Sequence, residues 1–133
     1  MIDIESQVYT KVVTALRAAH SGIGTAGVEN LSPTKFPFVS FYEADNYSVL
    51  STRDSASNEN YVNVMYEANI FSNKKDGKKA EAKSIEDTLD DVMNEIGFTK
   101  TSSTAVTEKD SSRYRRVVRY VAIVSKNNVI FRR

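Results

Sequence analysis

Cysteine and tryptophan are both absent from this chain of 133 residues, and histidine occurs once, at His20. The lack of cysteine excludes a disulfide framework, thiol catalysis and cysteine-based zinc or iron–sulfur sites. One histidine alone does not complete a Ser/His arrangement or a histidine metal site. We therefore expect no cofactor and no metal, and a small domain suited to a reducing compartment.

Long apolar runs are missing as well. No stretch approaches the roughly 20 apolar residues that a membrane-spanning helix needs, and the first residues, MIDIESQVY, lack the basic and apolar regions of a signal peptide. We expect a soluble chain that is made in the cytoplasm and does not contact a membrane. The formal net charge of +1 gives no general attraction to nucleic acid, so any such contact must come from local clusters.

Two segments have the spacing of amphipathic helices. A length of 133 residues is typical of one domain, so we expect a single domain over residues 1–133. Apolar residues recur three and four apart between Asp3 and His20 and again over residues 82–96. Asp3 is the expected N-cap of the first helix, and Gly22 and Gly97 are expected to end the two helices.

The remaining segments are rich in β-branched and aromatic residues, which are typical of strands. Strands are predicted at residues 36–46, 61–70, 98–106 and 113–125, with a terminal hairpin in NVIFRR and a short strand around 27–31. Pro37 is expected at the start of its strand or on an edge. The order helix, strands, helix, strands predicts an α+β fold in which two helices pack on a mainly antiparallel sheet.

The strand over residues 114–124 is apolar on both of its sides, and so is the segment FPFVSFY. A strand that is apolar on both sides needs cover on both sides. Either one helix lies on each face of the sheet, or a neighbouring subunit covers the second face.

A polar tract, YSVLSTRDSASNE, runs from Tyr47 to Glu59 between two of these strands. Loops of this length in compact domains often carry contacts to a partner. We therefore take Tyr47, Leu50 and Arg53 as candidate residues of a partner-docking loop.

Charges on the second helix are placed against its dipole. Four lysines, Lys74, Lys75, Lys78 and Lys79, precede or begin the helix, where carboxylates are favoured. They fit a polyanion, an acidic patch on a neighbouring copy, or a purely solubilising role. The helix also carries Glu86, Asp87, Asp90, Asp91 and Glu95. These carboxylates lack the spacing of a calcium loop, so we expect a solvated acidic face.

A second basic cluster lies on the strand near the end of the chain, where Arg113, Arg115 and Arg119 share one side and Arg116 takes the other. Arginine suits bidentate carboxylate or phosphate partners, so salt bridges between subunits and contact with a DNA backbone both fit. The sequence has no G-x-S-x-G elbow, no glycine-rich phosphate loop and no RNA-recognition motif. We expect no enzymatic activity.

The segments FSNKKDGKKAEAKSIEDTLDDVMNEIGFTKT, FPFVSFYEADN, YRRVVRYVAIV and IFRR resemble one protein family. It is the family of tail terminator, or tail completion, proteins of long-tailed phages and prophages, particularly those of Gram-positive hosts. The similarity keeps its order over most of residues 28–133, and its motifs are structural.

The resemblance implies a subunit of a ring, commonly a hexamer, at the head-proximal end of the tail tube. The ring stops tube polymerisation and gives the head a docking surface, while DNA passes through the bore without sequence-specific binding. The implied partners are further copies of the chain, the tail tube protein and head–tail connector proteins. The implied location is the head–tail junction of the virion, after assembly in the host cytoplasm.

On this basis the two basic clusters become candidates for the subunit interface or the lining of the bore. These residues are Lys74, Lys75, Lys78, Lys79, Arg113, Arg115, Arg116 and Arg119. Two alternatives stay open: another connector component such as a stopper or adaptor, and a small nucleic-acid-binding module that uses the same clusters.

Overall fold

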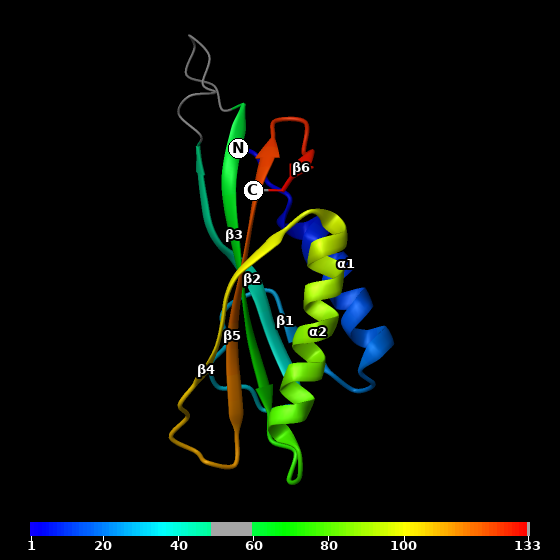
Figure 1. The fold of residues 1–133 in the computed structure, drawn as a ribbon, viewed down its shortest axis with the longest axis vertical. Helices are drawn as coiled ribbons and strands as arrows, with labels where there is room; N and C mark the ends of the chain where they lie inside the picture. Colours follow the sequence, from blue (N-terminus) through cyan, green and yellow to red (C-terminus); the bar gives the residue numbers. More distant parts are fainter. Residues whose placement is uncertain (49–59, 133) are drawn as a thin grey trace.

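A computed structural model describes residues 1–48 and 60–132, which form two helices and a six-stranded sheet (Figure 1). The elements are α1 (Glu5–Ala19), β1 (Gly24–Ala26), β2 (Phe38–Ser48), β3 (Tyr61–Ser72), α2 (Lys78–Ile96), β4 (Thr99–Val106), β5 (Tyr114–Ser125) and β6 (Ile130–Phe131). The fold is α+β in the predicted order. Leu50 and Arg53 of the predicted docking loop lie outside the described residues, whereas Tyr47 is in β2.

The strands lie in the order β1-β2-β3-β5-β4, and β6 pairs with the end of β5. All pairs are antiparallel except β1 with β2. The long strands β3 and β5 run side by side at the centre, from Tyr61 opposite Ser125 to Ser72 opposite Tyr114. The terminal hairpin was predicted and is confirmed by the β5–β6 pairing.

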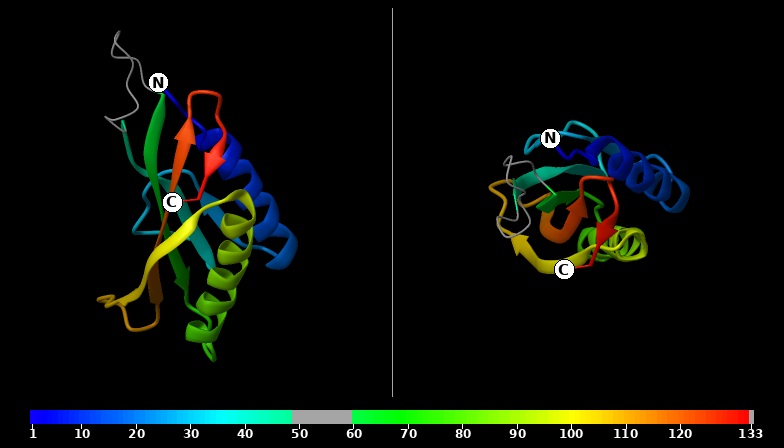
Figure 2. Two further views of the ribbon diagram at one scale, coloured as in Figure 1. Left: turned by 45° about the horizontal axis from the view of Figure 1, so that its top comes forward. Right: turned by 90° about the horizontal axis from the view of Figure 1, so that it is seen from above.

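Both helices lie on the same face of the sheet (Figure 2). Leu16 of α1 and Leu89 of α2 belong to one core with Tyr66 of β3 and Tyr120 of β5, and all four side chains are buried. The alternation predicted for β3 is confirmed, because the core residues of this strand are two apart. These are Val62, Val64, Tyr66, Ala68 and Ile70. The alternative in which one helix covers each face is therefore wrong.

We call the sheet face opposite the helices the outer face. Residues 27–37 cover part of it. The backbone N–H of Asn30 donates to Ser40 Oγ over 3.3 Å, and the Tyr42 hydroxyl donates to Glu29 Oε2 over 3.3 Å. Phe38 and Phe71 face each other across β2 and β3 at this end and are buried. A connection within the chain thus supplies part of the second cover that the apolar strands require.

Two local predictions are wrong by a few residues. The N-cap of α1 is Ile4, although Asp3 Oδ1 accepts the backbone N–H of Glu5 over 3.0 Å. The first short strand is Gly24–Ala26, before the predicted range. A Cβ at Gly24 would lie 2.7 Å from the Phe38 ring, so glycine allows β1 to approach β2 at this point.

Gly97 ends α2 as predicted. Its φ of 107° lies in the left-handed region, and its N–H donates to the carbonyl of Met93 over 3.1 Å. Phe98 then enters the core against Tyr66, with the ring centroids 5.3 Å apart in an edge-to-face arrangement. No helix within residues 1–48 and 60–132 is long and apolar enough to cross a membrane.

Candidate assembly surfaces

Glu86 of α2 is buried against the sheet and joins three elements. Its carboxylate accepts hydrogen bonds from Arg116 Nε of β5 over 2.6 Å, Lys100 Nζ of β4 over 2.9 Å and Ser103 Oγ over 2.7 Å. Lys100 also donates to Asp90 over 2.8 Å. The prediction of a solvated acidic helix is therefore wrong for Glu86 and Asp90. Helical periodicity places both beside the core but does not reveal the basic residues of β4 and β5.

The environment of Glu86 shifts its titration. Burial alone would raise its pKa, but hydrogen bonds from Ser103, Lys100 and Arg116 outweigh burial and hold the pKa below 4.5. A carboxyl group with a lowered folded-state pKa adds stability above its unfolded pKa, and that stability disappears as pH falls through the folded-state pKa.

We therefore expect the free energy of unfolding to decrease as pH falls below about 4.5. In this range the Glu86 carboxylate binds a proton more readily in the unfolded state than in the folded state, which favours unfolding. Urea denaturation at several pH values measures this dependence. Glu86→Gln should flatten the curve in this pH range. An equally steep curve in the variant would show that other carboxyl groups control acid unfolding.

Arg115 and Arg119 project from the outer face of β5, on the opposite side from Arg116, as predicted. Arg119 Nε donates to Glu67 Oε1 over 3.0 Å, and Arg115 donates to Asn69 Oδ1 over 2.8 Å. Burial would raise the pKa of Glu67, but hydrogen bonds from Tyr42, Arg119 and Asn69 lower it. The outer face therefore has a connected polar cluster at its middle.

Arg113 precedes β5 and lies 3.2 Å from Glu108, measured from Nη2 to Oε1. Arg115, Arg116 and Arg119 thus have hydrogen-bond acceptors within their own chain, whereas Arg113 has an ion-pair partner but its buried Nε donates no hydrogen bond within the described residues. A contact with a neighbouring subunit or with DNA would have to share these groups, and such a role for the arginines stays a prediction.

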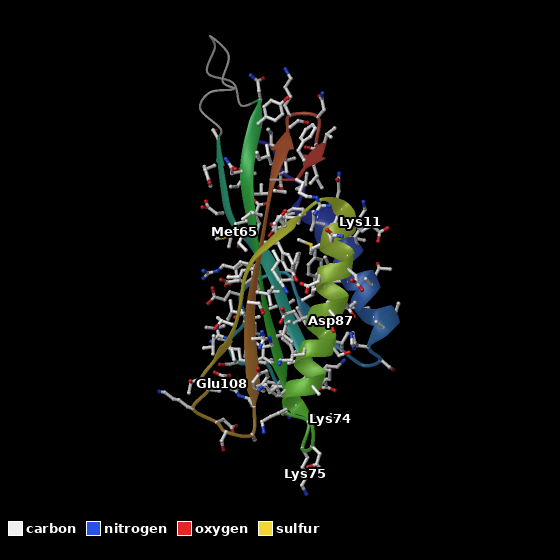
Figure 3. The ribbon with its side chains drawn as sticks, viewed as in Figure 1. Lys11, Met65, Lys74, Lys75, Asp87 and Glu108 are labelled. Carbon is white, nitrogen blue, oxygen red and sulfur yellow. The ribbon has the colours of Figure 1, made fainter. Side chains whose placement is uncertain are left out.

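The predicted lysines form a distinct group at one end of the molecule. We call this group, Lys74, Lys75, Lys78 and Lys79, the basic tip. Figure 3 shows Lys74 and Lys75 at the turn that leads into α2, beyond the end of the sheet. Lys74, Lys75 and Lys79 are exposed and Lys78 is partly buried. Among the described residues, no ion pair includes any of the four.

The exposed carboxylates of α2 lie further along the same helix. Asp87, Asp91 and Glu95 are four residues apart and exposed, and we call them the acidic row. For these residues the predicted solvated face is confirmed. Lys83 lies between the basic tip and the acidic row and is also exposed. Most charges of α2 therefore have the opposite order to the one that the helix dipole favours, although Glu81 lies in its first turn.

Lys79→Glu is expected to increase the free energy of unfolding by about 0.3–1 kcal/mol, because it places a carboxylate in the first turn of α2. Thermal unfolding at low ionic strength measures the gain. Lys109→Glu, in an exposed loop outside any helix, is the control and should give no such gain. A decrease in stability for Lys79→Glu would show that this lysine has a stabilising contact within the chain.

Three aromatic side chains are exposed on the outer face at the end of the molecule that carries β6. Tyr47, Tyr61 and Phe131 are 47%, 36% and 45% exposed. Strand register brings them to one side of the sheet, since Tyr47 lies opposite Asn63 and Phe131 opposite Ile123. The rings of Tyr61 and Phe131 are 6.1 Å apart.

We call these three residues the aromatic patch. Tyr61 also lines a shallow hollow of about 450 Å³ with Asn60, Ser125, Lys126 and Asn127. Tyr61 and Phe131 were not predicted as site residues. The outward positions in their strands are a signal for them, but only the pairing of β2, β3, β5 and β6 brings them together.

A second hollow, of about 270 Å³, is lined by Asp90, Asn94, Phe98, Thr99, Lys100, Tyr120 and Arg132. Its carboxylate, Asp90, accepts from the Tyr120 hydroxyl over 2.7 Å and from Lys100 over 2.8 Å. His20 is the C-cap of α1, two residues before the predicted Gly22, and its Nε2 lies 2.9 Å from Thr88 Oγ1. Within residues 1–48 and 60–132, no group of three or more histidine, aspartate or glutamate side chains could hold a metal ion.

The basic tip, the acidic row and the aromatic patch are all exposed on the described surface and available for contact with other molecules. The start of α2, which carries the tip, and β6, which carries Phe131 of the patch, lie toward opposite ends of the long axis of the molecule (Figure 1). Comparison with known protein families and with curated proteins finds no match to this chain.

Proposed function

We propose that this protein is a structural assembly protein that forms a ring at the head-proximal end of a phage tail tube. The ring, a hexamer in the form that the resemblance implies, stops tube polymerisation and provides the surface on which the head docks. Its partners are further copies of the chain, the tail tube protein and connector proteins. Support comes from the ordered sequence resemblance over most of residues 28–133 and from an α+β fold of the expected kind.

The aromatic patch is the observation that favours assembly over a free-standing role. Apolar side chains exposed singly are ordinary, whereas grouped exposed aromatic rings are typical of protein contacts. Tyr47 belongs to this patch, at the start of the loop that the sequence assigns to partner docking. We assign the patch to the contact with the tube end or with the connector.

Loss of the patch should abolish capping. In the presence of the full-length wild-type chain, the tail tube protein of the same phage or prophage should form tubes of limited length, seen by electron microscopy. Tyr47→Ser combined with Phe131→Ser should give longer tubes, because the aromatic contact area is lost. Val28→Ser combined with Leu31→Ser removes exposed apolar side chains elsewhere and should leave capping intact.

Two results would contradict this proposal. If the wild-type chain does not change tube length and stays monomeric beside assembled tubes, the terminator function is wrong. If the Tyr47→Ser/Phe131→Ser variant caps tubes as the wild type does, the docking surface lies elsewhere. Location of the protein in a virion by electron microscopy separates a terminator from a stopper or adaptor.

The basic tip supports nucleic-acid binding as a second candidate function, since its lysines have no ion-pair partner among the described residues. This function predicts DNA affinity that falls steeply with salt, because each phosphate contact releases counterions. DNA affinity that is weak and independent of salt would contradict it. Passage of DNA through a ring requires no such affinity, so the measurement distinguishes the two functions.

A further inference from the structure

Two clusters of opposite charge on one helix lack partners in the described part of the chain. The basic tip lies at the start of α2, and the acidic row lies in its second half. Lys75, Lys79, Asp87 and Asp91 are all exposed. None of them takes part in an ion pair within residues 1–48 and 60–132.

The stability of α2 does not explain this arrangement. The positive end of the helix dipole lies at its first turn, where Lys78 and Lys79 are unfavourable and Glu81 is favourable, and the negative end lies at its last turn, where Glu95 is unfavourable. The N-cap is Gly77, which has no side-chain acceptor for the first N–H groups, and the last turn has no basic residue. A partner that binds both clusters would offset the unfavourable placement.

A second copy of this chain is the partner that fits both clusters. A polyanion would match only the basic tip and would be repelled by the acidic row on the same helix. The net charge of +1 gives no further attraction to a polyanion. A neighbouring copy, in contrast, offers an acidic row to the tip and a basic tip to the row.

We propose that the basic tip of one copy contacts the acidic row of the next copy, head to tail. The tip projects from the end of the molecule, and Asp87 lies halfway along α2 (Figure 3). Along the helix axis Lys79 and Asp87 are about 12 Å apart, so the two surfaces are separate. A contact between two different surfaces is heterologous, and its repetition closes a ring when the rotation between copies allows it.

This inference rests on the ring function proposed above and names the surfaces that join neighbouring copies. The aromatic patch stays free for the tube or the connector, because it lies on the face of the sheet opposite α2. Electrostatic complementarity of this kind sets the partner and the register of a contact more than its affinity. The contact should therefore weaken as salt shortens the Debye length.

Charge-reversal variants of the full chain test the contact by sedimentation at low salt. Lys75→Glu with Lys79→Glu leaves Lys74 and Lys78 beside Asp76 and two new carboxylates, so both surfaces are acidic, and Asp87→Lys with Asp91→Lys makes both basic. Each variant alone should show an association constant about tenfold or more below that of the wild type. An equimolar mixture of the two should regain wild-type association, and so should one chain that carries all four changes. Lys35→Glu with Lys109→Glu is the matched control and should associate as the wild type does.

Several outcomes would overturn the contact. One is equal association by the wild type and both reversed variants. Others are a wild-type chain that is monomeric at every concentration at low salt, or one that stops at dimers. The tube assay tests the ring function separately. If the reversed variants associate as the wild type does and still cap tubes, the proposed contact is wrong but the ring function stands.

DNA supplies a final discriminating measurement. If Lys75→Glu with Lys79→Glu loses salt-dependent binding to a DNA duplex, and Asp87→Lys with Asp91→Lys does not restore association in the mixture, the basic tip binds nucleic acid. That result would also overturn the contact between copies. The expected result is restored association with no change in DNA affinity.

Discussion

Glu86→Gln is expected to lower the free energy of unfolding by about 2–4 kcal/mol, because it leaves buried positive charge without its counterion. The Glu86 side chain is 8% exposed and Arg116 is 14% exposed, so solvent screens this pair poorly. Glutamine keeps the shape of the side chain but not its charge. Lys100 is 37% exposed and recovers part of its hydration, which limits the loss.

Chemical denaturation of the variant and the wild type at neutral pH measures this effect. Asp87→Asn changes the same charge at the next position of α2, where the side chain is exposed, and should alter the free energy by less than about 0.5 kcal/mol. If the two variants lose equal stability, Glu86 is not held by a buried ion pair. A further variant, Arg116→Met with Glu86→Leu, should recover much of the loss, since an apolar pair of similar volume needs no counterion.

Phe98→Ala is expected to cost about 3–5 kcal/mol of folding free energy, the largest effect of any substitution considered for this chain. Phe98 is 1% exposed and packs edge-to-face on Tyr66, and Tyr66 stacks on Phe41 with 5.3 Å between ring centroids. The substitution removes this ring from the connection between α2 and β4. The cavity would lie between the helix layer and the centre of the sheet, where the surroundings relax little.

Phe131→Ala is the matched control, because it removes the same ring from an exposed position. It should cost less than about 1 kcal/mol of stability and act on partner docking instead. Thermal and urea unfolding of both variants measure the difference. A small effect for Phe98→Ala would mean that the end of α2 does not pack on Tyr66 in solution.

The sequence alone predicts the environments of Phe98 and Glu86 only in part. Phe98 follows a helix-ending glycine and an amphipathic helix, so its position at the start of a strand was predicted. Its contact with Tyr66, 32 positions earlier, depends on how α2 lies over β3. The pair Glu86 and Arg116 was missed for the same reason, since their separation of 30 positions leaves no periodic signal.

The exposed surfaces also differ in how far the sequence predicts them. The basic tip and the acidic row follow from the positions of charged residues in a predicted helix, and the structure leaves Lys75, Lys79, Asp87 and Asp91 exposed. The aromatic patch does not follow from any one segment. Tyr47, Tyr61 and Phe131 come from three strands and lie on one face because of the order and register of those strands, and the rings of Tyr61 and Phe131 are in contact.

Most elements, and the face on which their residues lie, follow from the sequence alone: the alternation of β3, the apolar stripe of α2 and the end of α2 at Gly97. These signals are local, because side-chain direction repeats every two residues in a strand and about every 3.6 in a helix. Which element covers which face of the sheet is seen in the three-dimensional structure alone. Both helices lie on one face, residues 27–37 cover part of the other, and Glu86 forms an ion pair with Arg116. Such choices depend on the joint burial of distant segments, and a periodic pattern does not specify its partner.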